Sequence, residues 1–163
     1  AIQGATEINC AVMGNTTIRP SVLEQPIGWE QFLTFENKYL SGGDGMKSAE
    51  RIIPAPLDAE LTARIRQMAV DTFRAVDGRG TARIDFLLKD GTVYVNEINT
   101  LPGSLAFYLW QEEKMSPTAV CDELIRLAFE AFAEKRRTTY DFKSRLLTQV
   151  AVRGLKGAKG VKS

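Results

Sequence analysis

Four polar side chains, Arg83, Asp85, Glu97 and Asn99, lie on two apolar runs that flank the turn signal "KDGT" at 89–92. The alternation of apolar and polar residues in both runs predicts the two strands of an antiparallel hairpin. Carboxylate and amide oxygens are the ligands that magnesium prefers, and a guanidinium pairs with phosphate oxygens. These residue types together therefore indicate magnesium-dependent chemistry on phosphates.

The register of this hairpin decides whether its two acids meet. A three-residue loop over 90–92 sets Asp85 opposite Glu97, whereas a two-residue loop would set Asp85 opposite Asn96 and separate the acids. We favour the three-residue loop because it collects apolar and polar side chains on opposite faces. Directly opposed acids repel one another, so the pair would need a proton or a cation between them.

A magnesium site at the opposed acids accounts for the whole polar set. Asp85, Glu97 and the amide oxygen of Asn99 would be its ligands, and Arg83, which this register sets opposite Asn99, would neutralise a phosphoryl group. The alternative is a surface hairpin whose polar face is only solvated. The run "NTLPG" favours a site, because Gly103 would bring a bare backbone N–H to a substrate oxygen.

The composition excludes several other kinds of site and partner. The 163 residues include no histidine, which excludes histidine metal sites and Ser-His or Cys-His catalytic pairs. The net charge of +1 implies no polyanionic partner, and no apolar run is long enough to span a bilayer. We therefore expect a cytoplasmic protein with neither a nucleic-acid nor a membrane partner. Cys10 and Cys121 are expected to be buried free thiols.

The remaining pattern predicts an α+β (α/β) fold in which an antiparallel sheet packs against helices. A strand is expected over 7–13, and a second over 16–26, where Pro20 favours an edge position. Asp58 is a candidate N-cap for a helix that ends before Gly78, and a second helix is expected over 117–136. A short last helix over 141–152 and a basic, solvated tail would complete the chain.

Several stretches resemble the ATP-grasp enzymes, and in particular the D-alanine–D-alanine ligases. "RIDF…VNEINTLPG" is similar to their magnesium-binding signature, "TEINCAVMGN" to the strand after the adenine hinge, and "FENKYLSGGDGMKSAERIIPAPL" to their lid loop. The resemblance covers about residues 2–135 and corresponds to the second half of the catalytic domain. It implies an ATP-grasp C-terminal subdomain over 1–136, with a C-terminal helix and a flexible tail over 137–163.

The resemblance also implies roles at the phosphate end of the site. Asp85, Glu97 and Asn99 would hold two Mg²⁺ ions, or Mn²⁺, on the phosphates of ATP, with Glu97 bridging the ions. Arg83 would stabilise the transition state, and Gly103 would donate its N–H to the tetrahedral oxyanion.

Further roles follow for nucleotide and substrate binding. Lys38 would contact the phosphates and Tyr39 would close over the substrate from the lid. Glu7 would hold the ribose hydroxyls, and Leu87 would pack on the adenine. Tyr108 stands where these ligases usually carry a small hydroxyl residue that binds the carboxylate of the acceptor, so it either reshapes that site or belongs to the core.

The implied reaction joins two D-alanine molecules through an acyl phosphate, for peptidoglycan precursors. The alternatives are an ATP-grasp ligase for a different amino acid or peptide, and a nucleotide-binding fragment without turnover. The N-terminal domain and the first half of the ATP site have no counterpart in this sequence, so this chain alone is expected to be a poor catalyst. Its partners would be ATP and a D-amino acid, and the resemblance leaves a homodimer open.

Overall fold

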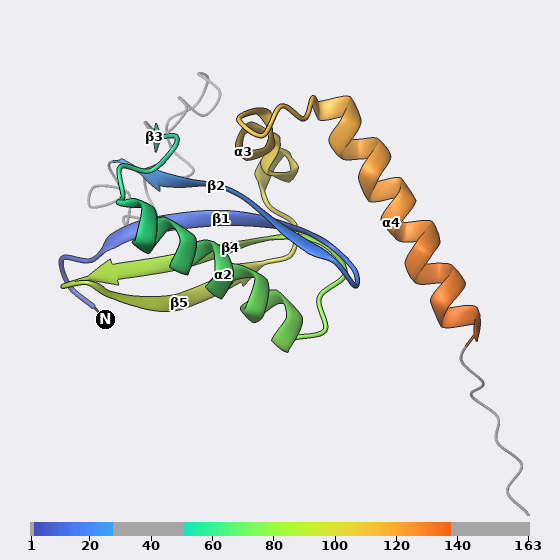
Figure 1. The fold of residues 1–163 in the computed structure, drawn as a ribbon, viewed down its shortest axis with the longest axis horizontal. Coiled ribbons are helices and arrows are strands. Elements are labelled where there is room, and N and C mark those ends of the chain that lie inside the picture. Colours follow the sequence, from blue (N-terminus) through green and yellow to red (C-terminus); the bar gives the residue numbers. More distant parts are fainter. Residues whose placement is uncertain (1, 28–50, 138–163) are drawn as a thin grey trace, which may run out of the picture. The chain divides into compact units, whose positions relative to one another are not determined.

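The chain forms a five-stranded antiparallel sheet in the order β3-β2-β1-β4-β5 (Figure 1). The structure is a computed structural model that describes residues 2–27 and 51–137. With the helices below, this sheet confirms the predicted α+β class. The strands are β1 (Thr6–Gly14), β2 (Ile18–Pro26), β3 (Arg51–Ile52), β4 (Gly80–Lys89) and β5 (Thr92–Asn99).

Three helices accompany the sheet in the described part of the chain: α2 (Ala59–Ala75), α3 (Phe107–Gln111) and α4 (Pro117–Arg137). The Asp58 carboxylate accepts the Leu61 N–H at 2.7 Å, which confirms the predicted N-cap of α2. At the start of α4 the Ser116 hydroxyl accepts the Ala119 N–H. None of the helices that the structure describes is long and apolar enough to cross a membrane. The helix predicted over 141–152 lies outside the described residues.

Alternation along the strands gives the sheet two different faces. Even-numbered residues of β1, from Ile8 to Val12, pack with Ile84 and Phe86 of β4 against α2, which lies along one face (Figure 1). Odd-numbered residues Ala11 and Met13 point to the opposite face. There they join a second buried cluster with Ala106, Leu109, Trp110, Val120 and Leu127. The rest of this second face carries the polar residues discussed below.

Pro20 lies at an irregularity between β1 and β2. Cys10 pairs with Leu23 but Val12 pairs with Pro20, so β2 contains an extra residue there. The Ser21 hydroxyl accepts the Ala11 N–H at 3.0 Å and replaces a ladder bond. The predicted edge position is wrong in one respect, because the two-residue β3 lies beyond β2 and pairs with its last two residues.

The hairpin β4–β5 has a two-residue loop, so the predicted three-residue loop is wrong. Lys89 pairs with Thr92, and both Asp90 and Gly91 have positive φ, as a type I′ turn requires. The predicted pairs Asp85–Glu97 and Arg83–Asn99 are nevertheless confirmed.

A β-bulge restores these pairs. Phe86 pairs with Val95 and Asp85 with Glu97, so Asn96 is an extra residue in β5. The bulge also changes which residues share a face. Val93 lies on the apolar side, and strict alternation from it would carry Glu97 and Asn99 to that side as well. With the extra residue they face the polar side instead.

The two cysteines differ in their surroundings. Cys10 is buried under α2, and burial raises its thiol pKa to about 12. Cys121 is exposed, so its predicted burial is wrong. It follows the buried Val120 on α4, and consecutive helical residues point in directions about 100° apart.

The chain divides into two compact units, the first over Ala1–Ala131 and the second from Phe132 onward.

Candidate functional site

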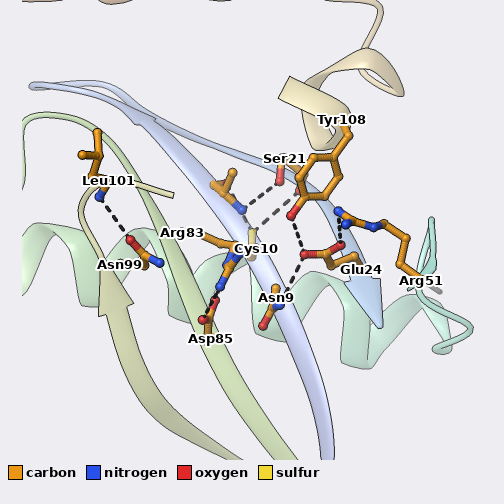
Figure 2. A network of polar contacts seen from close by, with 11 residues as sticks. Asn9, Cys10, Ser21, Glu24, Arg51, Arg83, Asp85, Asn99, Leu101 and Tyr108 are labelled. Atoms are coloured by element: carbon orange, nitrogen blue, oxygen red, sulfur yellow. Dashed lines mark hydrogen bonds and ion pairs between the residues drawn. The ribbon is translucent and has the colours of Figure 1, made fainter. Parts of the chain in front are cut away.

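A row of polar residues crosses four strands on the sheet face opposite α2. Asn9 of β1 pairs with Glu24 of β2 on one side and with Asp85 of β4 on the other, and Asp85 pairs with Glu97 of β5. Directly paired residues project from the same face of a sheet. The row therefore places three carboxylates and one amide side by side, and most of these residues are labelled in Figure 2.

Arg83 and Asp85 form a two-pronged ion pair on this face. Nε of Arg83 donates to Oδ1 of Asp85 at 2.7 Å, and Nη2 donates to Oδ2 at 2.8 Å (Figure 2). The Asp85 side chain is 4% exposed and that of Arg83 is 19% exposed. The hydrogen bonds to Asp85 raise the pKa of Arg83, and burial opposes this rise. Arg83 therefore stays charged and held by two contacts within the site.

The three predicted magnesium ligands lie in adjoining positions. Asp85 and Glu97 are directly paired, and Asn99 lies two residues beyond Glu97 on β5. The Asn99 Oδ1 atom accepts the Leu101 N–H at 3.2 Å, which begins the turn that leads into "LPG".

The donor set fits a hard divalent cation in its chemistry. All three side chains offer oxygen, and each carboxylate oxygen bonded by Arg83 keeps a second lone pair. Within residues 2–27 and 51–137, no three His, Cys, Asp or Glu side chains come together as a metal-binding group. The fit therefore depends on the amide of Asn99 as the third ligand beside Asp85 and Glu97.

Glu7 and Leu87, predicted to contact the nucleotide, are directly paired between β1 and β4. Leu87 in turn pairs with Tyr94 of β5, so an acid, an aliphatic chain and an exposed aromatic ring form a second row next to the polar one. Burial raises the pKa of Glu7, a hydrogen bond with Asn9 lowers it, and the nearby Asp85 raises it further. The structure thus brings these two predicted residues together on the face that carries Asp85.

A strained turn follows the hairpin. Gly103–Ala106 forms one short 3₁₀ turn, in which Ser104, Leu105 and Ala106 all have φ near +50°. Residues other than glycine rarely adopt this left-handed backbone conformation, which costs about 1–2 kcal/mol per residue. Gly103 at its start is exposed, and a Cβ added there would contact nothing within 4 Å. The backbone of Gly103 is therefore open to approach from outside.

Tyr108 joins a polar network that the sequence did not reveal. Its hydroxyl donates to Oε1 of Glu24 at 2.7 Å, and Nη1 of Arg51 contacts Oε2 of Glu24 at 3.4 Å (Figure 2). The Arg51 guanidinium also lies 4.2 Å from the centre of the Tyr108 ring. Glu24 and Arg51 gave no signal in the sequence, because 84 positions separate Glu24 from Tyr108.

The polar row contains one unsatisfied atom. Nδ2 of Asn9 donates to Glu24 at 3.3 Å, but the buried Oδ1 of Asn9 has no hydrogen-bond partner among the described residues. An unpaired buried acceptor costs about 1–3 kcal/mol. Such an atom beside Asp85 is expected where a donor from elsewhere completes a site. The predicted lid residues Lys38 and Tyr39 lie outside the described residues.

Comparisons with known proteins show the family to which this chain belongs. The family model described as "D-ala D-ala ligase C-terminus" matches residues 1–126. A D-alanine–D-alanine ligase of Thermosipho africanus is 43% identical over 141 residues, which are 86% of this chain and 38% of the relative. A second, from Lactiplantibacillus plantarum, is 36% identical and covers 87% of this chain and 39% of the relative. The chain thus spans less than half the length of the relatives it matches.

Solved structures give the same result. The D-alanine-D-alanine ligase from Coxiella burnetii superposes with a TM-score of 0.66 at 25% identity, covering 95% of this chain and 37% of the other. The VanG D-Ala:D-Ser ligase from Enterococcus faecalis superposes with a TM-score of 0.63 at 26% identity, covering 78% and 37%. With its matched family model and its relatives above 40% identity, this chain belongs to the D-Ala–D-Ala ligase C-terminal family.

Proposed function

We propose that this chain is the catalytic C-terminal part of an ATP-dependent carbon–nitrogen ligase that joins D-alanine to D-alanine for peptidoglycan precursors. In the proposed reaction ATP phosphorylates the carboxylate of one D-alanine. The amine of a second D-alanine then attacks the acyl phosphate and phosphate leaves. Residues 1–136 would be the C-terminal half of the catalytic domain. The enzyme would be cytoplasmic, and a homodimer is compatible with this proposal.

The phosphate end of the site would be formed by the hairpin β4–β5. Asp85, Glu97 and Asn99 would hold two Mg²⁺ ions, or Mn²⁺, which when bound neutralise charge on the phosphate oxygens. Arg83, already fixed by Asp85, would present its remaining N–H groups to the transferring phosphoryl group. Gly103 would donate its backbone N–H to the oxyanion that forms when the amine attacks.

The nucleotide would lie along the neighbouring row of the same face. Glu7 would accept the ribose hydroxyls, and Leu87, its directly paired neighbour, would pack on the adenine. Lys38 and Tyr39 would come from the lid to contact the phosphates and to exclude water from the acyl phosphate. Positioning and electrostatics supply most of the rate enhancement in this scheme.

One observation carries the proposal: the bulge at Asn96 places Glu97 directly opposite the buried Asp85, next to an arginine held by two hydrogen bonds. Arg83 is paired with Asp85, one of these two opposed carboxylates, and like charges across a strand pair repel. A cation and a polyphosphate would remove that repulsion. The membership of the family supports the same reading.

The test is D-alanine-dependent phosphate release from ATP by the longest native polypeptide that contains this chain. We expect release with dipeptide formation, and loss of at least about a hundredfold in kcat/KM for Glu97→Gln, as for removal of a group that stabilises developing charge. Glu60→Gln, an exposed acid on α2, is the matched control and should behave as the wild type.

Two results would count against the proposal in different ways. Full activity of the Glu97→Gln variant would show that the assignment of Glu97 as a metal ligand is wrong. A wild-type protein that binds Mg²⁺ and ATP, but whose phosphate release no D-amino acid stimulates, would show that the ligase assignment is wrong. Electron paramagnetic resonance can measure the affinity for Mn²⁺ of wild type and of Glu97→Gln. This measurement tests the metal site independently of turnover.

A second candidate is a ligase whose acceptor is a D-amino acid other than D-alanine. The observation in its favour is Tyr108, which is tied to Glu24 and Arg51 and stands where the resemblance places a small hydroxyl residue. A structural neighbour, the VanG protein, is named as a D-Ala:D-Ser ligase. Turnover with a panel of D-amino acids distinguishes this candidate from the first.

A further inference from the structure

Asn9 lies within the polar row but has no part in the proposed reaction. It pairs with Glu24 of β2 on one side and with Asp85 of β4 on the other, and it is 2% exposed. Directly paired residues project from the same face, with Cβ atoms about 5 Å apart. Asn9 is therefore an immediate neighbour of the buried carboxylate that we assign to the metal site (Figure 2).

The hydrogen bond to Glu24 fixes which way the Asn9 amide points. Its Nδ2 donates to Oε1 of Glu24 at 3.3 Å, on the β2 side of the row. A reversed amide would set Oδ1 against that carboxylate, and two acceptors without a proton between them repel. Oδ1 is therefore the end that stays unpaired, and it is buried with no hydrogen-bond partner among the described residues.

The side chains that flank Asn9 do not satisfy this oxygen. Glu24 and Asp85, its directly paired neighbours, are carboxylates, and an ionised carboxylate accepts hydrogen bonds but donates none. Arg83 directs Nε and Nη2 to Asp85. An unpaired buried acceptor is unfavourable, so its presence in a native site calls for a donor that arrives with a ligand.

A bound magnesium ion brings donors of this kind. Magnesium usually keeps several water molecules when carboxylates bind it, and these waters donate hydrogen bonds to acceptors around the site. Among the proposed ligands, Asp85 is paired with Glu97 on one side and with Asn9 on the other. Within the described part of the chain, Oδ1 of Asn9 is thus an unpaired acceptor next to a proposed metal ligand.

We propose that Asn9 is a positioning residue of the metal site, whose Oδ1 accepts a hydrogen bond from a water molecule on the divalent cation. This inference rests on the proposed function and deepens it, because it adds an outer contact to the ligands Asp85, Glu97 and Asn99. Oδ1 is shielded from solvent in this structure, so a neighbouring side chain must shift to admit the water. Glu7, two residues before Asn9 on the same face, is half-buried and can turn aside.

The test measures the affinity for Mn²⁺ by electron paramagnetic resonance, in the longest native polypeptide that contains this chain, with and without ATP. Asn9→Leu removes the acceptor at similar side-chain size. It should weaken Mn²⁺ binding by about tenfold, the lower end of the effect of losing an outer contact to a metal. Asn9→Asp keeps an oxygen acceptor but loses the donor to Glu24, and it should bind Mn²⁺ at least as tightly as the wild type.

Glu24→Gln is the matched control, because it disturbs the same hydrogen bond from the other side and leaves Oδ1 of Asn9 in place. Its Mn²⁺ affinity should stay within about twofold of the wild type. Melting temperatures without metal report the stability of each variant separately from metal binding. If Asn9→Leu does not fold, Asn9→Val takes its place, because a β-branched residue suits a strand.

The outcomes separate this inference from the function on which it rests. A wild type that binds no Mn²⁺ overturns the metal site of the proposed function. A wild type that binds Mn²⁺, with Asn9→Leu binding it as tightly, overturns the role of Asn9 alone. Equal losses of affinity in Asn9→Leu and Glu24→Gln, with lower melting temperatures in both, would also overturn it, because Asn9 would then be structural. Weaker binding by Asn9→Leu, with Asn9→Asp and Glu24→Gln unaffected, supports the inference.

Discussion

Arg83 and Asp85 lie two residues apart on β4, project from the same face, and are joined by hydrogen bonds of 2.7 and 2.8 Å. This contact aligns the arginine along its own strand. It also neutralises Asp85, whose side chain is 4% exposed. Arg83 thus stabilises the fold through Asp85 and also takes part in the proposed chemistry.

Arg83→Met is expected to lower the free energy of unfolding by about 3 kcal/mol, because it leaves a buried carboxylate without its partner. Arg83→Lys keeps the charge but cannot form both bonds, so we expect a smaller loss of stability and a large loss of kcat. Urea denaturation and steady-state kinetics measure the two effects.

Arg74→Met is the matched control for this pair. Arg74 contacts Asp71 on the exposed side of α2, and such surface pairs contribute less than about 1 kcal/mol. Equal destabilisation by Arg74→Met and Arg83→Met would show that the burial of Asp85 has no energetic consequence.

Glu7→Gln is expected to stabilise the fold and to weaken ATP binding. Burial raises the pKa of Glu7 above its ordinary value of 4.5, so the folded protein binds this proton more tightly than the unfolded chain does. Stability from Glu7 is therefore fully present below pH 4.5 and is lost as the pH rises through the raised pKa. The gain from Glu7→Gln should be present at pH 7 and should vanish in acid.

Denaturation of wild type and Glu7→Gln at several pH values measures that difference, and titration with ATP measures the affinity. Glu60→Gln serves as the exposed control, with no pH-dependent gain. A Glu7→Gln variant that is less stable than wild type at pH 7 would mean that the carboxylate is stabilised in its charged form.

Gly103→Ala is expected to fold like the wild type and to lose activity. A Cβ there meets no atom within 4 Å, so the fold tolerates it, while the methyl group would stand at the backbone N–H that we assign to the oxyanion. Thermal melting and kcat are the two readouts. Full activity would show that no substrate group approaches Gly103.

Gly14→Ala is the contrasting variant. Gly14 has φ of +147°, and its Cβ would lie 2.0 Å from the Thr17 carbonyl oxygen. We expect a loss of at least about 2 kcal/mol in the free energy of unfolding, because backbone atoms would have to move. A melting temperature equal to that of Gly103→Ala would contradict the turn geometry.

Gly91→Ala tests the turn that sets the register. Gly91 has φ of +74° with open space around it, so only backbone strain opposes a side chain, and we expect a loss of about 1 kcal/mol. Gly91→Asn should lose less, because asparagine tolerates the left-handed region. Denaturant unfolding of both variants gives the comparison, and a stability of Gly91→Ala above wild type would exclude the type I′ turn.

The sequence was sufficient for elements whose signals are local. Asp58 before an apolar helix pattern predicted the N-cap of α2, and the alternating runs predicted the strands of the hairpin. The pairing of Asp85 with Glu97 followed from the demand that polar residues share a face. The N-cap and the strands needed only neighbouring residues and one rule of periodicity. The Asp85–Glu97 pair was predicted correctly from a wrong loop length, because the bulge at Asn96 compensates for the shorter turn.

Features that depend on distant contacts or on irregular backbone were not predictable. The bulge at Asn96 has no residue signature, because asparagine fits many loops and strands. The short helical segments over 103–111 contain three left-handed residues that no propensity favours. Glu24 and Arg51 contact Tyr108 because the fold brings β2, β3 and α3 together, and these three elements are far apart in the sequence. The roles assigned to the site residues stay predictions until the variants above are measured.

The turn and the bulge of β4–β5 have a joint consequence for how this protein tolerates changes in length. A two-residue loop with a bulge, and a three-residue loop without one, both set Asp85 opposite Glu97. A single insertion at the turn alone would rotate every later side chain of β5 to the other face. The same insertion combined with deletion of Asn96 would restore the pairing. Related sequences should therefore change the length of this hairpin by compensating pairs of insertions and deletions.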